Sequence, residues 1–151
     1  MRVYEAKLVY EPTLFEVGAK ALSSADSVYE YMKDILEVHP MNEVFYVLLL
    51  NTKNKPLGRI AISTGTVSGT LVHPREVFRP AILAGATAVI CVHNHPSGDP
   101  APSSADINVT RKLRDAAKTI DISLLDHVIL GRPECDPARV GYYSFRSAGI
   151  I

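Results

Sequence analysis

Two uninterrupted apolar runs place the strongest constraint on how this chain can fold. The first, EVFYVLLLN, covers residues 43–51, and the second, ATAVICVH, covers residues 86–93. A strand with one face in water would alternate apolar and polar residues, because successive side chains point to opposite faces. Neither run alternates, which predicts two strands in the middle of a sheet covered on both faces. With 47% apolar residues among 151, the chain can supply that cover.

Helix and strand patterns alternate around these two runs. We expect further strands at residues 2–12, 57–63, 122–131 and 140–145, and helices at residues 24–38, at 74–85 and from Ser103 or Ser104 to Lys118. The short polar segment before residue 57 predicts a hairpin. Pro80 predicts a kink or break in the second helix, and Gly85 predicts its end. The pattern indicates an α/β fold, an α/β/α sandwich with a mixed central sheet, in a single domain over residues 1–151.

The overall charge argues against several classes of function. Sixteen basic residues balance sixteen acidic ones, so no net field draws the chain to nucleic acid or to an anionic membrane. Binding of either kind would need a local patch. The N-terminus lacks a signal-peptide pattern, and no apolar segment is long enough to cross a bilayer. Cys91 lies inside an apolar run, far from Cys135, which favours reduced thiols and a cytoplasmic location.

The segment after the second run, HNHPSGDPAPSSAD at residues 93–106, has the residue types of a metal site. His93 and His95 point to the same side of a strand end, since they are two residues apart. Three prolines restrict the loop that follows. Asp106 then lies in phase with the apolar positions of the next helix, where a buried carboxylate needs a compensating cation. Imidazole and carboxylate ligands together predict a zinc ion.

Simpler explanations exist for the same residues. Ser103 and Asp106 form a capping-box pattern, in which the serine caps the helix and the acid reaches back to it. Histidines at a strand end are more often exposed, or hydrogen-bonded in the core, than bound to a metal. His127, among apolar residues of a later strand, is expected to be such a hydrogen-bonded histidine rather than a fourth ligand. Its neighbour Asp126 is expected on the opposite face.

A catalytic zinc site also needs a proton acceptor. Three protein ligands leave a position for water, and zinc lowers the pKa of such a water to about 7, while a nearby carboxylate takes and returns the proton. Glu43, at the entry to the first apolar strand, is the best candidate for this base, and Glu76 is the second. From spacing alone, a solvated residue at a strand start remains the more frequent explanation for Glu43.

Together these residues resemble the JAMM metalloprotease motif of the MPN domain, in which a Glu precedes His-x-His-Pro, a Ser and an Asp. Seven residues separate His95 from Ser103, and two separate Ser103 from Asp106, as in that motif. The segments VLLLNTKN, HPREVFRPAI, HNHPSGDPAPSSAD and LLDHVILG resemble the RadC-like branch of the family, historically described as DNA repair proteins. The resemblance covers about residues 25–147.

The resemblance implies a cytidine-deaminase-like α/β/α core and a zinc ion bound by His93, His95 and Asp106. It implies that Glu43 is the general acid and base, and that Ser103 stabilises the oxyanion of the tetrahedral intermediate. The residue between the two histidines is Asn94, as is common in RadC-like members, whereas eukaryotic isopeptidases have Ser or Thr. No helix-hairpin-helix domain is expected, because about 25 residues precede the resemblance.

Three functions compete on this sequence. The leading hypothesis is a zinc-dependent hydrolase that cleaves a peptide or isopeptide amide in a protein or peptide substrate. An alternative is a DNA-associated nuclease or nucleic-acid-binding protein, for which the outer face of the Asp106 helix offers four cations, Arg111, Lys112, Arg114 and Lys118. A solvated helix face explains these cations more simply. The third is a non-catalytic scaffold, against which the complete set of metal ligands argues.

Overall fold

The computed structural model describes residues 20–65 and 72–151. They form a five-stranded sheet in the order β2-β1-β3-β4-β5. The strands are β1 (Val44–Leu50), β2 (Pro56–Thr64), β3 (Ala88–Asn94), β4 (Ser123–Leu130) and β5 (Tyr142–Ser144). Only the β3 and β4 pairing is parallel, and the neighbours on either side are antiparallel. The predicted hairpin and mixed sheet are thus confirmed, whereas the strand expected at residues 2–12 lies outside the described residues.

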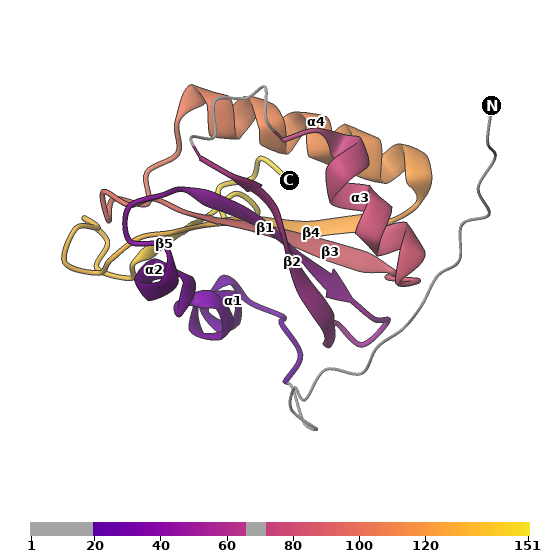
Figure 1. Ribbon diagram of the computed structural model, residues 1–151, viewed down its shortest axis with the longest axis horizontal. Helices are drawn as coiled ribbons and strands as arrows, with labels where there is room; N and C mark the ends of the chain where they lie inside the picture. Colours follow the sequence, from indigo (N-terminus) through magenta and orange to yellow (C-terminus); the bar gives the residue numbers. More distant parts are fainter. Residues whose placement is uncertain (1–19, 66–71) are drawn as a thin grey trace, which may run out of the picture.

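Helices cover both faces of this sheet (Figure 1). On one face lie α3 (Pro74–Leu83) and α4 (Ser104–Ile120), and on the other lie α1 (Ala25–Met32) and α2 (Ile35–Val38). Each central strand contributes to two separate cores: Val47 packs on the side of α3 and α4, and its neighbour Leu48 on the side of α1 and α2. The two apolar runs lack alternation because both of their faces are buried. The predicted α/β/α arrangement is confirmed.

Two helix predictions need correction. The helix expected over residues 24–38 is two helices, because the chain turns at Lys33 and Asp34 between α1 and α2. The apolar spacing runs on into Ile35 without interruption, so periodicity could not reveal the turn. Pro80 does not break α3, which continues to Leu83. Burial of Val77, Phe78 and Ala81 against the sheet offsets the one backbone hydrogen bond that this proline removes.

The ends of the helices follow the sequence signals. Gly85, with a φ of 64°, follows the last turn of α3 as predicted. Helix α4 begins after the N-cap Ser103 and ends at Ile120, and its C-cap Asp121 is left-handed with a φ of 58°. Among residues 20–65 and 72–151, no helix is both long and apolar enough to cross a membrane. Cys91 and Cys135 are both free thiols.

Candidate metal centre

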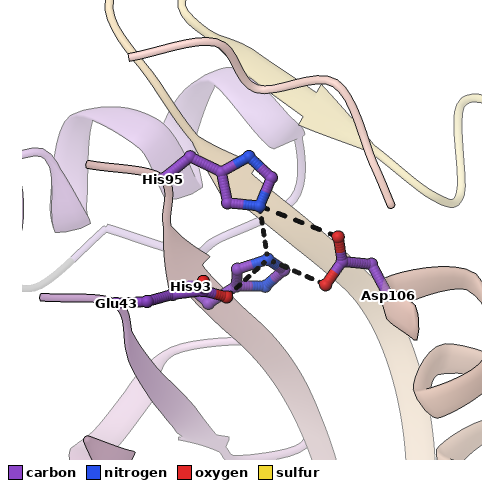
Figure 2. A group of neighbouring side chains, drawn as sticks. All are labelled: Glu43, His93, His95 and Asp106. Carbon is purple, nitrogen blue, oxygen red and sulfur yellow. Dashed lines mark hydrogen bonds and ion pairs between the residues drawn. The ribbon is translucent and has the colours of Figure 1, made fainter. Parts of the chain in front are cut away.

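Four side chains converge at one end of β3, as Figure 2 shows. Glu43, His93, His95 and Asp106 each offer one ligand atom, and these atoms all lie within 4.8 Å of one another. His93 Nε2 is 3.1 Å from His95 Nε2, 3.3 Å from Asp106 Oδ1 and 3.6 Å from Glu43 Oε1. His95 Nε2 is 3.7 Å from Asp106 Oδ2. The structure therefore brings together every residue that the sequence nominated as a ligand, together with the preferred base.

The pairing of β1 with β3 brings Glu43 to the histidines. Phe45 is opposite His93 in the antiparallel register, and Glu43, two residues earlier, points to the same face of the sheet. Glu76, the second candidate for the base, lies outside the cluster on the surface of α3 and pairs with Arg79 at 2.9 Å. The choice of Glu43 over Glu76 thus depends on which strand lies beside β3.

Asn94, the residue between the two histidines, fastens the segment that carries Glu43. The buried Asn94 amide accepts a hydrogen bond from Val44 N at 2.9 Å. It donates to the carbonyls of His39 at 3.1 Å and Asn42 at 3.0 Å. Three hydrogen bonds therefore hold the backbone on both sides of Glu43 against the end of β3. These contacts of Asn94 could not be predicted from the sequence, because they depend on the pairing of β3 with β1.

The predicted capping box of Ser103 and Asp106 is present, and it leaves the Asp106 carboxylate close to both histidines. Ser103 N and Oγ donate to Asp106 Oδ2 at 2.7 and 2.6 Å, and Asp106 N donates to Ser103 Oγ at 3.2 Å. The Asp106 side chain is 2% exposed, and its carboxylate also faces both histidines. Burial by itself would raise the pKa of Asp106, but His93, His95 and Ser103 hold that pKa well below its usual range. The carboxylate is therefore ionised and fixed in place.

Buried groups contact the ring face and the Nδ1 atom of His93, away from the cluster. Its ring stacks on Phe45, with centroids 5.9 Å apart and an interplanar angle of 13°. Its Nδ1 lies 2.8 Å from Nε2 of His127, and Nδ1 of His127 lies 2.6 Å from Oγ1 of Thr110. His127 is fully buried, and burial lowers its pKa well below the usual value. It is a hydrogen-bonded core histidine as expected, while its neighbour Asp126 accepts a hydrogen bond from Ser144 Oγ at 2.6 Å.

His95 is held by a loop instead. Its Nδ1 donates to the carbonyl of Asp99 at 2.8 Å, and its own N–H donates to Leu130 O at 2.9 Å. Burial opposes protonation of His95, but the neighbouring Asp106 carboxylate and the Asp99 carbonyl raise its pKa above the usual value. At neutral pH a metal ion would therefore compete with a proton for this imidazole.

The cations proposed for nucleic acid are unequal in the structure. Arg114 is half-buried, donates to the carbonyl of Ile150 at 3.0 Å and pairs with Asp115 at 3.1 Å. Arg111, Lys112 and Lys118 are exposed on α4. Because Arg114 is engaged by these contacts, only the other three cations are exposed and available to bind phosphate groups.

Thr110 and the contact of His127 with His93 were missed by sequence reasoning. Thr110 is a buried polar residue one helical turn after Asp106, on the apolar face of α4. A polar residue at that spacing was the available signal, because it has to find a hydrogen-bond partner in the core.

Comparison with known proteins agrees with the family resemblance seen in the sequence motifs. The family model described as the RadC-like JAB domain matches residues 22–150. A UPF0758 protein of Pelodictyon phaeoclathratiforme is 43% identical over 132 residues, which are 87% of this chain and 56% of that protein. A UPF0758 protein of Thermotoga maritima is 43% identical over 130 residues, 86% of this chain and 54% of that protein. The chain thus spans about half the length of the curated relatives that it matches.

Proposed function

The chain belongs to the family of RadC-like JAB domains, and on this premise we propose that it is a zinc-dependent hydrolase that cleaves a peptide or isopeptide amide. The observation that carries the proposal is the convergence of Glu43, His93, His95 and Asp106, whose ligand atoms lie within 4.8 Å of one another. Two carboxylates so close together in a largely buried site are costly unless a cation compensates them.

The set of ligand atoms fits a zinc ion. His93, His95 and Asp106 would hold it with two imidazole nitrogens and one carboxylate, the composition found in catalytic rather than structural zinc sites. A bound zinc ion would supply Lewis acidity toward an amide carbonyl and would make a water molecule acidic at neutral pH. His93 and Asp106 are buried, so water could not replace them easily as ligands of the zinc ion.

Glu43 is proposed to move the proton. Its side chain is 17% exposed, and its Oε1 lies 3.6 Å from His93 Nε2, beside the proposed metal ligands. A carboxylate there would accept a proton from the attacking water and deliver it to the nitrogen of the leaving amine. The Asn94 hydrogen bonds would keep the backbone of Glu43 in place during both transfers.

Ser103 is proposed to donate a hydrogen bond to the developing oxyanion. In the structure its Oγ already donates to Asp106 Oδ2 at 2.6 Å. A hydroxyl has one proton, so donation to substrate requires rotation away from Asp106, whose Oδ2 would still accept from Ser103 N at 2.7 Å. Ser103 would then serve both the carboxylate and the substrate at different stages.

Elemental analysis and peptide cleavage test the proposal together. Glu43→Gln keeps the side-chain size but removes the proton acceptor, so we expect full zinc content and a kcat/KM lowered about 100-fold or more. Glu76→Gln makes the same change outside the cluster and should leave both quantities unchanged. The substrate would be a peptide library that includes lysine isopeptides. A zinc-loaded protein that cleaves no member, or an active Glu43→Gln variant, would contradict the proposal.

Nucleic-acid binding receives less support. Arg111, Lys112 and Lys118 give α4 three exposed cations, but the net charge of the chain is zero. Counterion release makes phosphate binding strongly salt-dependent. Titration of duplex and single-stranded DNA at two salt concentrations would distinguish this function, since the hydrolase proposal expects no salt-sensitive binding.

A further inference from the structure

A line of three hydrogen bonds runs from His93 into the core of the protein. His93 Nδ1 contacts His127 Nε2 at 2.8 Å, and His127 Nδ1 contacts Thr110 Oγ1 at 2.6 Å. The Thr110 hydroxyl also lies 2.6 Å from the backbone carbonyl of Asp106. All three side chains are fully buried. The line therefore connects one proposed ligand on β3, through β4, to the backbone of another on α4.

The carbonyl of Asp106 decides which way the protons point. A carbonyl oxygen can only accept, so the single hydroxyl proton of Thr110 is donated to it, and Thr110 Oγ1 must accept from His127 Nδ1. A neutral imidazole has one proton, which leaves His127 Nε2 as an acceptor. His93 Nδ1 must then donate, and in a neutral His93 ring the lone pair is on Nε2, the atom that would bind a metal ion.

The opposite direction leaves one contact unsatisfied and is incompatible with the proposed metal site. If Thr110 donated to His127, two oxygen atoms 2.6 Å apart would face each other without a proton between them. His127 would then donate to His93 and leave the proton of that ring on Nε2, the nitrogen that faces Asp106 Oδ1 at 3.3 Å. A protonated Nε2 cannot bind a metal ion.

We propose that His127 and Thr110 are positioning residues that fix the tautomer and orientation of His93 as a metal ligand, an inference that rests on the proposed zinc site. Hydrogen bonding of the second ring nitrogen is how proteins orient a ligand histidine and increase its basicity. Aromatic stacking fixes the ring planes as well: His127 packs on Phe145 with centroids 4.8 Å apart and an angle of 10°, as His93 packs on Phe45.

The helix that carries Thr110 also supplies a matched control. Thr119 Oγ1 donates to the carbonyl four residues earlier, that of Asp115, at 3.1 Å, as Thr110 does to Asp106, but Thr119 is exposed. Thr110→Val and Thr119→Val therefore remove the same hydroxyl from the same helix. Only Thr110→Val also removes the acceptor from His127. Thr110→Ser retains the hydroxyl and should bind zinc as the unmodified chain does.

The experiment combines nitrogen NMR with zinc affinity. In the ¹⁵N-labelled, zinc-loaded chain, we expect His127 to carry its proton on Nδ1 and His93 to be protonated on Nδ1. Competition with a chromogenic chelator should show about tenfold weaker zinc binding for Thr110→Val, within the range known for outer hydrogen-bond partners of metal ligands. Thr119→Val should match the unmodified chain. A His127 protonated on Nε2, or equal zinc affinities for the two valine variants, would overturn the inference.

The same measurements separate this inference from the proposed function. His93→Ala tests the zinc site itself, and undiminished zinc affinity in that variant would reject both proposals. Loss of zinc in His93→Ala with unchanged affinity in Thr110→Val would reject the positioning role alone. The NMR result for His127 needs no substrate and no catalytic activity, so it is decided independently of the bond that the protein cleaves.

Discussion

His93 and His95 are two residues apart in sequence, yet the structure supports them by different means. His93 lies within β3, is fully buried, and has its second ring nitrogen bonded to the side chain of His127. His95 lies just beyond the strand, keeps 16% of its side chain exposed and has its second nitrogen bonded to the backbone carbonyl of Asp99. One proposed ligand thus depends on the core, and the other on a loop.

The loop depends on close backbone contacts in place of core packing. Gly98, with a φ of 84°, accepts a hydrogen bond from Arg132 N at 2.7 Å. A Cβ on Gly131 would collide with Gly98 O and lie 2.9 Å from Pro100 N. Two glycines therefore allow the segment after β4 to hold the loop of His95. Two proposed ligands separated by one residue are therefore expected to respond differently to mutation.

Removal of each imidazole should have the largest effects on zinc binding and stability, and should distinguish the core-supported His93 from the loop-supported His95. His93→Ala and His95→Ala should both abolish zinc binding, measured by elemental analysis. In the metal-free state, His93→Ala should lower the free energy of unfolding by about 2–4 kcal/mol, because it leaves a cavity and an unpaired His127. At neutral pH, His95→Ala should change it by about 1 kcal/mol or less, since the side chain is partly exposed. Equal urea midpoints for the two variants would remove the distinction.

A methyl group at Gly131 should disturb only the loop that holds His95, and not the buried groups that hold His93. Gly131→Ala would displace the loop by about 1 Å, and a shift of that size can cost about 100-fold in kcat/KM. We expect this loss with the His93 and His127 nitrogen signals unchanged in NMR spectra. Gly58→Ala is the control, because a Cβ at Gly58 has no atom within 4 Å. Altered signals of His127 in Gly131→Ala would show that the supports of His93 and His95 are not independent.

The smallest effect concerns pH and the metal-free protein. The raised pKa of His95 means that its pairing with Asp106 stabilises the fold fully below the unfolded pKa of about 6.5, and the contribution is lost as pH rises through the folded pKa. The lowered pKa of Asp106 adds stability above about pH 3.9 that is lost on further acidification. His95→Gln should therefore destabilise most between about pH 4 and 6.5, on the order of 1 kcal/mol. A pH-independent difference in urea denaturation would contradict this sign.

Local patterns predicted much of the architecture. Apolar runs, a polar turn and helix signals gave the central strands, the hairpin and α4 near their observed positions, because each signal depends on neighbours within one element. Two local predictions, both about helices, were wrong. The turn at Lys33 and Asp34 interrupts no apolar period, and Pro80 is tolerated because the surrounding side chains of α3 are buried.

The residue types of the site, and the spacing that sets His93, His95 and Asp106 within reach of one another, are properties of the sequence alone. Which distant residues meet them was decided by strand order. The antiparallel pairing of β1 with β3 brings Glu43 rather than Glu76 to the cluster, and the parallel pairing of β3 with β4 places His127 behind His93. Spacing along the chain carries no information on which strands will pair, because that choice depends on the burial of both sheet faces at once.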